Sequence, residues 1–178
     1  MNIVFLDIDG VLQPYDSNDR FYEINKNTKK LINDLSEKHN IDYNQYVIYD
    51  VLAAYYDWHP QAISRLKAVL DATDSKIIAS TDWKSERFPN KIHDLLELHD
   101  LGKYWYKDNI IIKDTLPFPK IRNLEILNSL QNYPIDNFVV LDDMKELKEY
   151  YPHNSVITNN YISVNNMEDC IKILKKIK

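Results

Sequence analysis

The sequence predicts an α/β fold in which a parallel sheet is covered by helices on both faces. Apolar runs of strand length alternate with segments of helical periodicity, and this alternation is typical of parallel sheets. Polar residues follow several of the runs, at the sheet edge where such folds collect their ligands. The expected strands are residues 3–6, 76–80, 109–112, 138–141 and 155–158.

Helices are expected between these strands. Pro60 begins a stretch in which Ile63, Leu66, Val69 and Leu70 fall on one face, as in a helix entered through proline. The same spacing predicts further helices around residues 92–96, around 124–130 and over 167–178.

Residues 15–58 do not fit the alternation and are expected to form a small insertion after the first strand. Residues 1–178 are expected to form a single domain that carries this insertion. Residues 27–38 favour a helix with Leu31, Ile32 and Leu35 facing inward. The insertion is interpreted either as a packed excursion or as a small lid over a site.

Composition excludes several classes of protein. The hydrophobic fraction of 44% and the charged fraction of 28% are typical of a folded globular protein. A net charge of -5 argues against bulk nucleic-acid binding. The single cysteine, Cys170, excludes an intrachain disulfide and a cysteine zinc cluster. No signal-like segment and no apolar run of about 20 residues is present, so a cytoplasmic protein outside the membrane is expected.

Two pairs of carboxylates follow apolar runs directly. Asp7 and Asp9 come after residues 3–6, and Asp142 and Asp143 come after residues 138–141. Carboxylates near a core are costly unless they bind a cation or take part in chemistry. Oxygen ligands without histidine or cysteine nearby favour Mg²⁺. Gly10, after the first pair, allows the backbone to turn close to a ligand.

With these motifs the sequence resembles the haloacid dehalogenase (HAD) superfamily, whose motifs run in the order Asp-x-Asp-Gly, Ser/Thr, Lys/Arg and an acidic pair. Ser80 with the adjacent Thr81 supplies the second motif, and Lys120 or Arg122 supplies the third. The run from Ser80 to Lys84 is also similar to the HAD domains of Swiss-army-knife RNA repair proteins. That similarity favours Arg122, which precedes a Glu-Ile pair.

The resemblance covers nearly the whole chain except residues 15–58. It implies a Rossmann-like three-layer fold and a Mg²⁺-dependent phosphatase. Asp7 is then the nucleophile that forms an aspartyl phosphate, and the Asp9 side chain is the general acid and base. Ser80 binds the phosphoryl oxygens with help from the Thr81 backbone, close to the Gly10 turn.

The same resemblance implies a metal site. Mg²⁺ is expected to be held by Asp7, the Asp9 backbone carbonyl and Asp142, with support from Asp143. Arg122 or Lys120 adds positive charge.

The substrate implied is a phosphorylated small metabolite, a nucleotide or a nucleic-acid end. The alternative interpretation is a catalytically silent HAD fold that binds a phosphorylated ligand or a protein. The presence of Asp7, Asp9, Ser80 and Asp142 argues against a loss of turnover.

Overall fold

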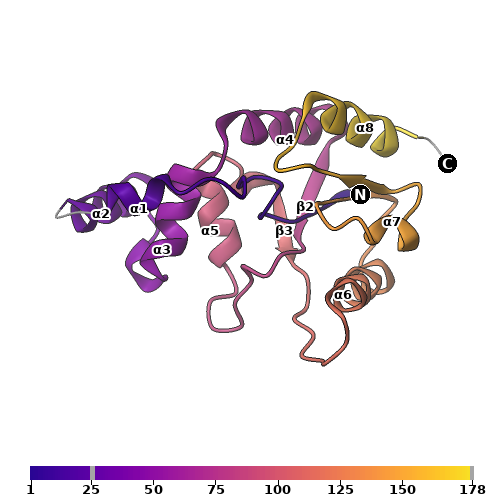
Figure 1. Ribbon diagram of the computed structural model, residues 1–178, viewed down its shortest axis with the longest axis horizontal. Coiled ribbons are helices and arrows are strands. Elements are labelled where there is room, and N and C mark those ends of the chain that lie inside the picture. Colours follow the sequence, from indigo (N-terminus) through magenta and orange to yellow (C-terminus); the bar gives the residue numbers. More distant parts are fainter. Residues whose placement is uncertain (25–26, 177–178) are drawn as a thin grey trace.

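A computed structural model describes residues 1–24 and 27–176, and its centre is a five-stranded parallel sheet (Figure 1). The strands are β1 (Asn2–Leu6), β2 (Ser75–Ala79), β3 (Trp105–Asp108), β4 (Asn137–Asp142) and β5 (Ser155–Ile157). Their order is β3-β2-β1-β4-β5, so β1 lies in the middle, paired with β2 and β4. The predicted α/β fold with a parallel sheet is confirmed.

Helices cover both faces of the sheet and make three layers (Figure 1). One face carries α4 (Pro60–Thr73) and α8 (Val164–Leu174), and the other carries α6 (Phe118–Asn132) and α7 (Leu147–Tyr150). The residues of β1 alternate between the two layers: Val4 and Leu6 join the core under α4 and α8, while Ile3 and Phe5 join the core under α6. Both faces of the central strand are therefore apolar and buried.

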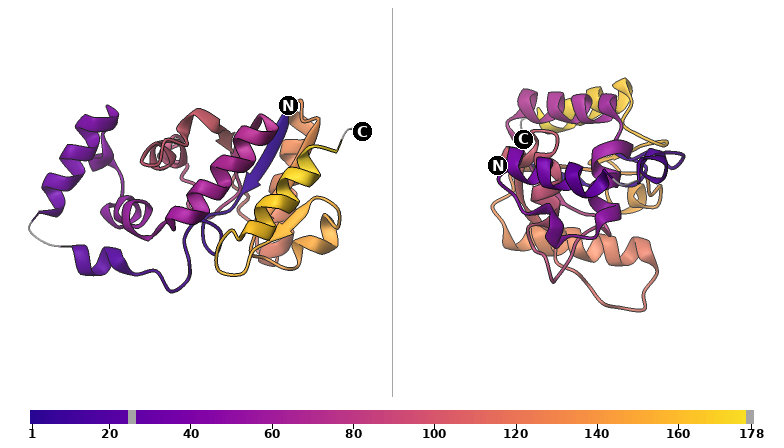
Figure 2. Two further views of the ribbon diagram at one scale, coloured as in Figure 1. Left: turned by 90° about the horizontal axis from the view of Figure 1, so that it is seen from above. Right: turned by 90° about the vertical axis from the view of Figure 1, so that its left-hand side faces the viewer.

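The described part of residues 15–58, which leaves out 25–26, forms helices that lie beside α5 (Lys91–Glu97), away from the sheet (Figures 1 and 2). The Tyr43 hydroxyl donates to the backbone oxygen of Asp94 at 2.8 Å, and Lys91 pairs with Asp50 at 2.7 Å. These contacts fasten the insertion to α5. The insertion's helical segments are α1 (Asp19–Glu23), α2 (Thr28–His39), η1 (Tyr43–Gln45), α3 (Ile48–Leu52) and the π-helical η2 (Ala53–Asp57).

The prediction of a strand at residues 109–112 was wrong. The strand in this part of the chain is β3, which ends at Asp108 and follows the short helix η3 (Gly102–Tyr104). The backbone nitrogen of Asn109 still donates to Ala79 at 2.8 Å. Beyond it the chain leaves the sheet, and Ile110 and Ile111 are exposed. The apolar run therefore belongs to a loop after the strand.

The helix predicted around residues 124–130 is α6, but its buried face differs from the apolar pattern. Leu124 and Leu127 are exposed, whereas Arg122 and Glu125 are buried together with Ile126. This face borders the polar end of the sheet described below, where charged side chains are paired. The closing helix predicted over 167–178 is α8, and residues 177–178 lie outside the described part of the chain.

Within the described residues, no helix combines the length and apolar character needed to cross a membrane.

Candidate active site

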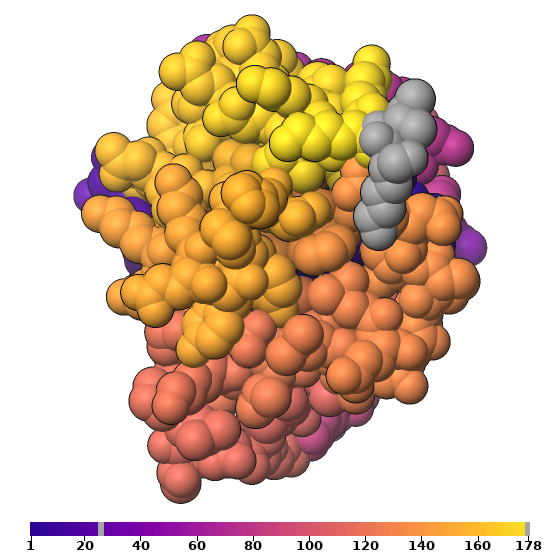
Figure 3. Space-filling view, turned by 90° about the vertical axis from the view of Figure 1, so that its right-hand side faces the viewer, coloured from indigo at the N-terminus to yellow at the C-terminus, as the bar shows by residue number. Residues whose placement is uncertain are grey.

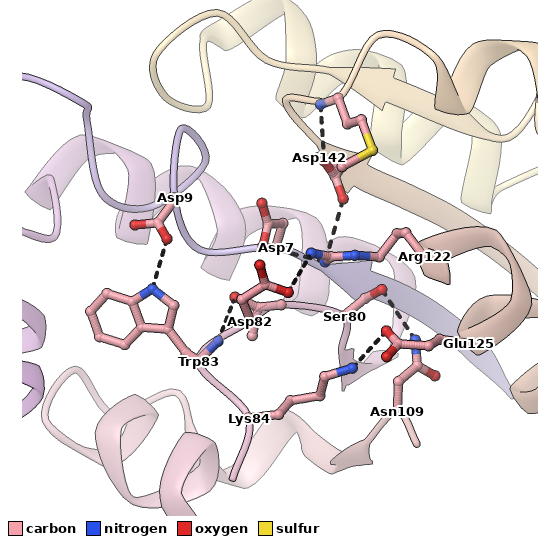
Figure 4. Close-up of polar contacts among 12 residues, drawn as sticks. Asp7, Asp9, Ser80, Asp82, Trp83, Lys84, Asn109, Arg122, Glu125 and Asp142 are labelled. Atoms are coloured by element: carbon pink, nitrogen blue, oxygen red, sulfur yellow. Dashed lines mark hydrogen bonds and ion pairs between the residues drawn. The ribbon is translucent and has the colours of Figure 1, made fainter. Parts of the chain in front are cut away.

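Three carboxylates meet at the carboxyl ends of the two central strands. Asp7 directly follows β1, Asp142 ends β4, and Asp143 follows it. One oxygen from each of the three lies within 4.8 Å of the others. The backbone nitrogen of Asp7 donates to Leu141 at 3.0 Å, which extends the β1–β4 pairing to the site. Figure 4 shows the side chains of Asp7 and Asp142 both reaching the guanidinium of Arg122.

The carboxylates of this cluster are crowded, and two of them, Asp7 and Asp142, are buried. Burial and the nearby charge of Asp142 raise the pKa of Asp7 well above its ordinary value, against the opposing effect of Arg122. Burial also raises the pKa of Asp142, whose side chain is fully buried. Its Oδ1 accepts a hydrogen bond from the Met144 backbone at 2.9 Å, but its Oδ2 has no hydrogen-bond donor among the described residues.

These features suit a small divalent cation. The ligand atoms are all carboxylate oxygens, which Mg²⁺ prefers, and the buried Asp142 Oδ2 accepts no hydrogen bond from the described residues that a cation would have to displace. A cation there would also offset the mutual repulsion of the carboxylates. The described residues of the site thus fit the expected metal.

Arg122 reaches this cluster from α6, with 3% of its surface exposed. Its Nη1 lies 3.4 Å from Asp7 Oδ1 and 3.6 Å from Asp142 Oδ2, and its Nη2 lies 3.5 Å from Asp82 Oδ1. Burial lowers the pKa of Arg122, but these three carboxylates together with Glu125 outweigh burial and raise it, so the guanidinium stays charged. Lys120 is exposed on α6 and does not enter the cluster. Of the two predicted bases, the structure brings only Arg122 to the site.

The two hydroxyls at the end of β2 face different partners. Ser80 is fully buried, and its Oγ accepts from Asn109 Nδ2 at 3.1 Å on the side away from Asp7 (Figure 4). The Ser129 hydroxyl in turn donates to the side-chain oxygen Oδ1 of Asn109. The Thr81 Oγ1, by contrast, accepts from the Trp83 backbone nitrogen at 3.4 Å, and hydrogen bonding of the Thr81 side chain with Asp7 lowers the pKa of Asp7. The hydroxyl beside the predicted nucleophile is therefore that of Thr81, whose predicted contribution was its backbone.

Gly10 makes the tight turn after the first motif. Its φ is +70°, and a Cβ at this position would lie 2.6 Å from the Tyr15 hydroxyl and 2.9 Å from Asp143 Cβ. Both the backbone conformation and the lack of space require glycine. The Gly10 carbonyl accepts from the Thr158 hydroxyl at 2.6 Å, which fixes the turn against the segment after β5.

Asp9 lies on the other side of this turn, with its carboxylate directed toward Trp83 (Figure 4). Oδ2 accepts from the Trp83 indole nitrogen at 2.9 Å, and Oδ1 accepts from Gln13 Nε2 at 3.4 Å. Asp9, the predicted general acid, is only two residues from Asp7 in the sequence. Its side chain is nevertheless held by Trp83 and Gln13 and not by the partners of Asp7.

A buried ion pair, which the sequence analysis did not predict, lies beside Arg122. Lys84 Nζ is 2.7 Å from Glu125 Oε2, and both side chains are almost fully buried. Burial lowers the pKa of Lys84, although Glu125 opposes this. No local pattern reveals the pair, because its members are 41 residues apart in the chain. Together with Thr81, Arg122 and Phe118 it lines a cavity of about 170 Å³.

Comparison with known proteins gives one family. A family model described as the HAD domain in Swiss Army Knife RNA repair proteins matches residues 3–167. The match runs from β1 into α8 and includes all the site residues described above. No curated protein and no solved structure matches the chain.

Proposed function

The chain belongs to the family of HAD domains found in Swiss Army Knife RNA repair proteins, and from this premise we propose that it is a Mg²⁺-dependent phosphomonoesterase acting through an aspartyl phosphate. The observation that carries the proposal is the cluster of the buried Asp7 and Asp142 with the partly exposed Asp143, which has Arg122 beside it. Such a cluster joins a carboxylate nucleophile to fixed positive charge and to a site for a cation.

In the proposed reaction, a carboxylate oxygen of Asp7 attacks the phosphorus of the substrate. An Asp7 oxygen–phosphorus bond forms while the ester phosphorus–oxygen bond breaks, and Asp9 gives its proton to the leaving oxygen. A water then attacks the phosphorus of the aspartyl phosphate and passes a proton to Asp9. Inorganic phosphate leaves, and the Asp7 carboxylate is restored.

Positive charge is needed because a carboxylate and a phosphate repel each other. Arg122 supplies one such charge from the chain, and the Thr81 hydroxyl adds a hydrogen-bond donor beside Asp7. Mg²⁺ would be held by Asp7, Asp142, Asp143 and the backbone carbonyl of Asp9. When bound, it supplies further positive charge for the phosphoryl oxygens.

The site is suited to a terminal phosphate, which several classes of substrate carry. We propose a phosphorylated small metabolite, a nucleotide or a nucleic-acid end, and the RNA repair named in the family description supports the last of these. The net charge of -5 disfavours binding to long stretches of nucleic acid. A terminal phosphate requires few contacts to the remaining backbone, so the two observations are compatible.

The test is phosphate release from aryl phosphates, sugar phosphates, nucleotides and end-phosphorylated oligonucleotides, with Mg²⁺ and with a chelator. Asp7→Asn removes the nucleophile at nearly constant volume and should reduce release to background. Asp34→Asn, the same change at an exposed position of α2, should behave as wild type. Release that persists in Asp7→Asn would remove the proposed nucleophile. A panel without any release by wild type would favour a binding module that has lost turnover.

A further inference from the structure

The carboxylate of Asp9 is held by a side chain that no part of the proposed reaction uses. Trp83 Nε1 donates to Asp9 Oδ2 at 2.9 Å (Figure 4). The indole is itself fixed by packing: its ring centroid lies 6.1 Å from that of the buried Trp58, and Lys91 Nζ lies 5.8 Å from the ring centroid. The N–H is thus aimed at Asp9 by the surrounding core.

The second oxygen of Asp9 has a weaker and more adaptable partner. Gln13 Nε2 lies 3.4 Å from Oδ1, at the long end of the hydrogen-bond range. The other end of the same amide, Gln13 Oε1, is buried and has no hydrogen-bond partner within the described residues. The Gln13 backbone is fixed by the turn, since its carbonyl accepts from the Gly10 nitrogen at 2.7 Å.

The two oxygens of Asp9 are held differently. An indole nitrogen is a hydrogen-bond donor only, and the 2.9 Å bond from Trp83 holds Oδ2 in place. Oδ1 has the long 3.4 Å contact with Gln13, so it is the oxygen that can face a substrate.

We propose that Trp83 is a positioning residue that holds the Asp9 carboxyl in one orientation, with Oδ1 rather than Oδ2 facing the leaving group. The inference rests on the proposed phosphatase function. Trp83 is thereby assigned a role in protonation of the leaving group. This role is distinct from that of Arg122 and the metal, which bind the phosphoryl group.

Trp83→Phe tests the assignment, because it keeps an aromatic ring and removes only the N–H donor. Without the donor, the Asp9 carboxyl can turn and protonation of the leaving group becomes less efficient. Leaving groups that depart poorly need this proton most. Across 4-nitrophenyl, phenyl and 4-methoxyphenyl phosphate, kcat/KM should fall about 10-fold or more for the least acidic phenol and much less for 4-nitrophenol.

Trp105→Phe is the matched control. It removes another indole donor, which binds Asp108 Oδ1 at 3.0 Å away from the acidic cluster. A purely structural effect of either change would lower kcat/KM by the same factor for all three esters, so an unchanged slope against leaving-group acidity in Trp83→Phe would overturn the inference. In an Asp9→Asn background, Trp83→Phe should add no further change of slope.

Failure of the proposed function has a different signature. If wild type releases no phosphate from these esters, or if release survives Asp7→Asn, the phosphatase proposal fails and the inference fails with it. If wild type is active and Asp7→Asn is not, an unchanged slope in Trp83→Phe rejects the inference alone. Thermal unfolding midpoints of Trp83→Phe and Trp105→Phe, compared with wild type, show whether either variant has lost its fold.

Discussion

Arg122 and Lys120 illustrate how much depends on the position of a single residue along a helix. They are two residues apart in the sequence, yet Arg122 is buried against Asp7 and Asp142 while Lys120 is exposed. We expect Arg122→Ala to lower kcat/KM by roughly 10²–10³-fold, because it removes a fixed charge that stabilises the transferring phosphoryl group. Lys120→Ala should remain close to wild type.

Phosphate-release kinetics of the two variants, measured side by side, check this expectation. Arg122→Lys helps to interpret them, because it retains the charge but not the planar donor group that lies between the carboxylates. An equal loss in Arg122→Ala and Lys120→Ala would contradict the assignment of the third motif to Arg122.

Residue positions next to the chemistry could be predicted, but the direction of their side chains could not. The sequence places Ser80 and Thr81 at one strand end and does not say which hydroxyl turns toward Asp7. Ser80 turns away because Asn109, 29 residues later in the chain, donates to it. That partner comes from the end of β3, a strand whose position was predicted incorrectly. The assignment to Thr81 required the three-dimensional structure.

The central elements were predictable because they are buried on both faces. β1, β2 and β4 consist largely of apolar residues, and each appears as an uninterrupted run. β3 is an edge strand, none of its residues is fully buried, and its sequence Trp-Tyr-Lys-Asp has no apolar run. The same limitation applies to α6, whose buried face includes charged residues that are stabilised by partners distant in the sequence.

Asp108, the last residue of β3, is expected to make the stability of the protein depend on pH. Burial raises the pKa of Asp108 to about 6, although Trp105, Lys84 and Lys91 all act to lower it. The folded state therefore holds this proton more tightly than the unfolded state, whose carboxyl has its ordinary pKa of about 4. The protonated Asp108 carboxyl therefore contributes fully to stability below about pH 4, and this contribution is lost as the pH rises to about 6. The free energy of unfolding falls by up to about 3 kcal/mol over this range.

Asp108→Asn cannot lose this proton and keeps an oxygen that can accept from Trp105. We expect the variant to gain stability relative to wild type as the pH rises from about 4 to about 6, with no further change above that range. Urea unfolding of both proteins at a series of pH values measures the difference. A difference in the free energy of unfolding that is independent of pH would contradict a raised pKa at Asp108.

At the scale of the whole molecule, the parallel topology does most to assemble the site. Because β1 lies between β2 and β4, their carboxyl ends bring Asp7, Thr81 and Asp142 to one edge from positions far apart in the chain. The order of the motifs is enough to predict this arrangement. The path of residues 15–58 could not be predicted in this way, because it depends on contacts such as the hydrogen bond from the Tyr46 hydroxyl to Asp94, 48 residues away.

We expect the acidic edge, formed by Asp7, Asp142 and Asp143, to make the stability of the protein depend on a divalent cation. Without one, burial and mutual repulsion disfavour the charged forms of Asp7 and Asp142, so Asp142→Asn should unfold at a higher temperature than wild type in chelator. With Mg²⁺ the order should reverse, because the variant lacks a ligand. Mg²⁺ at about 100 times its Kd stabilises a folded protein by about 2.7 kcal/mol, which for a chain of this length is roughly 5–10 °C in Tm.

Thermal unfolding with and without Mg²⁺ measures this effect independently of any substrate. Asp34→Asn, with its exposed side chain in α2, should show the same Mg²⁺ response as wild type. If Asp142→Asn retains the full increase in Tm, the cation does not bind at this cluster. Loss of the increase in Asp142→Asn alone would locate the Mg²⁺ site at the ends of β1 and β4, where the proposed reaction requires it.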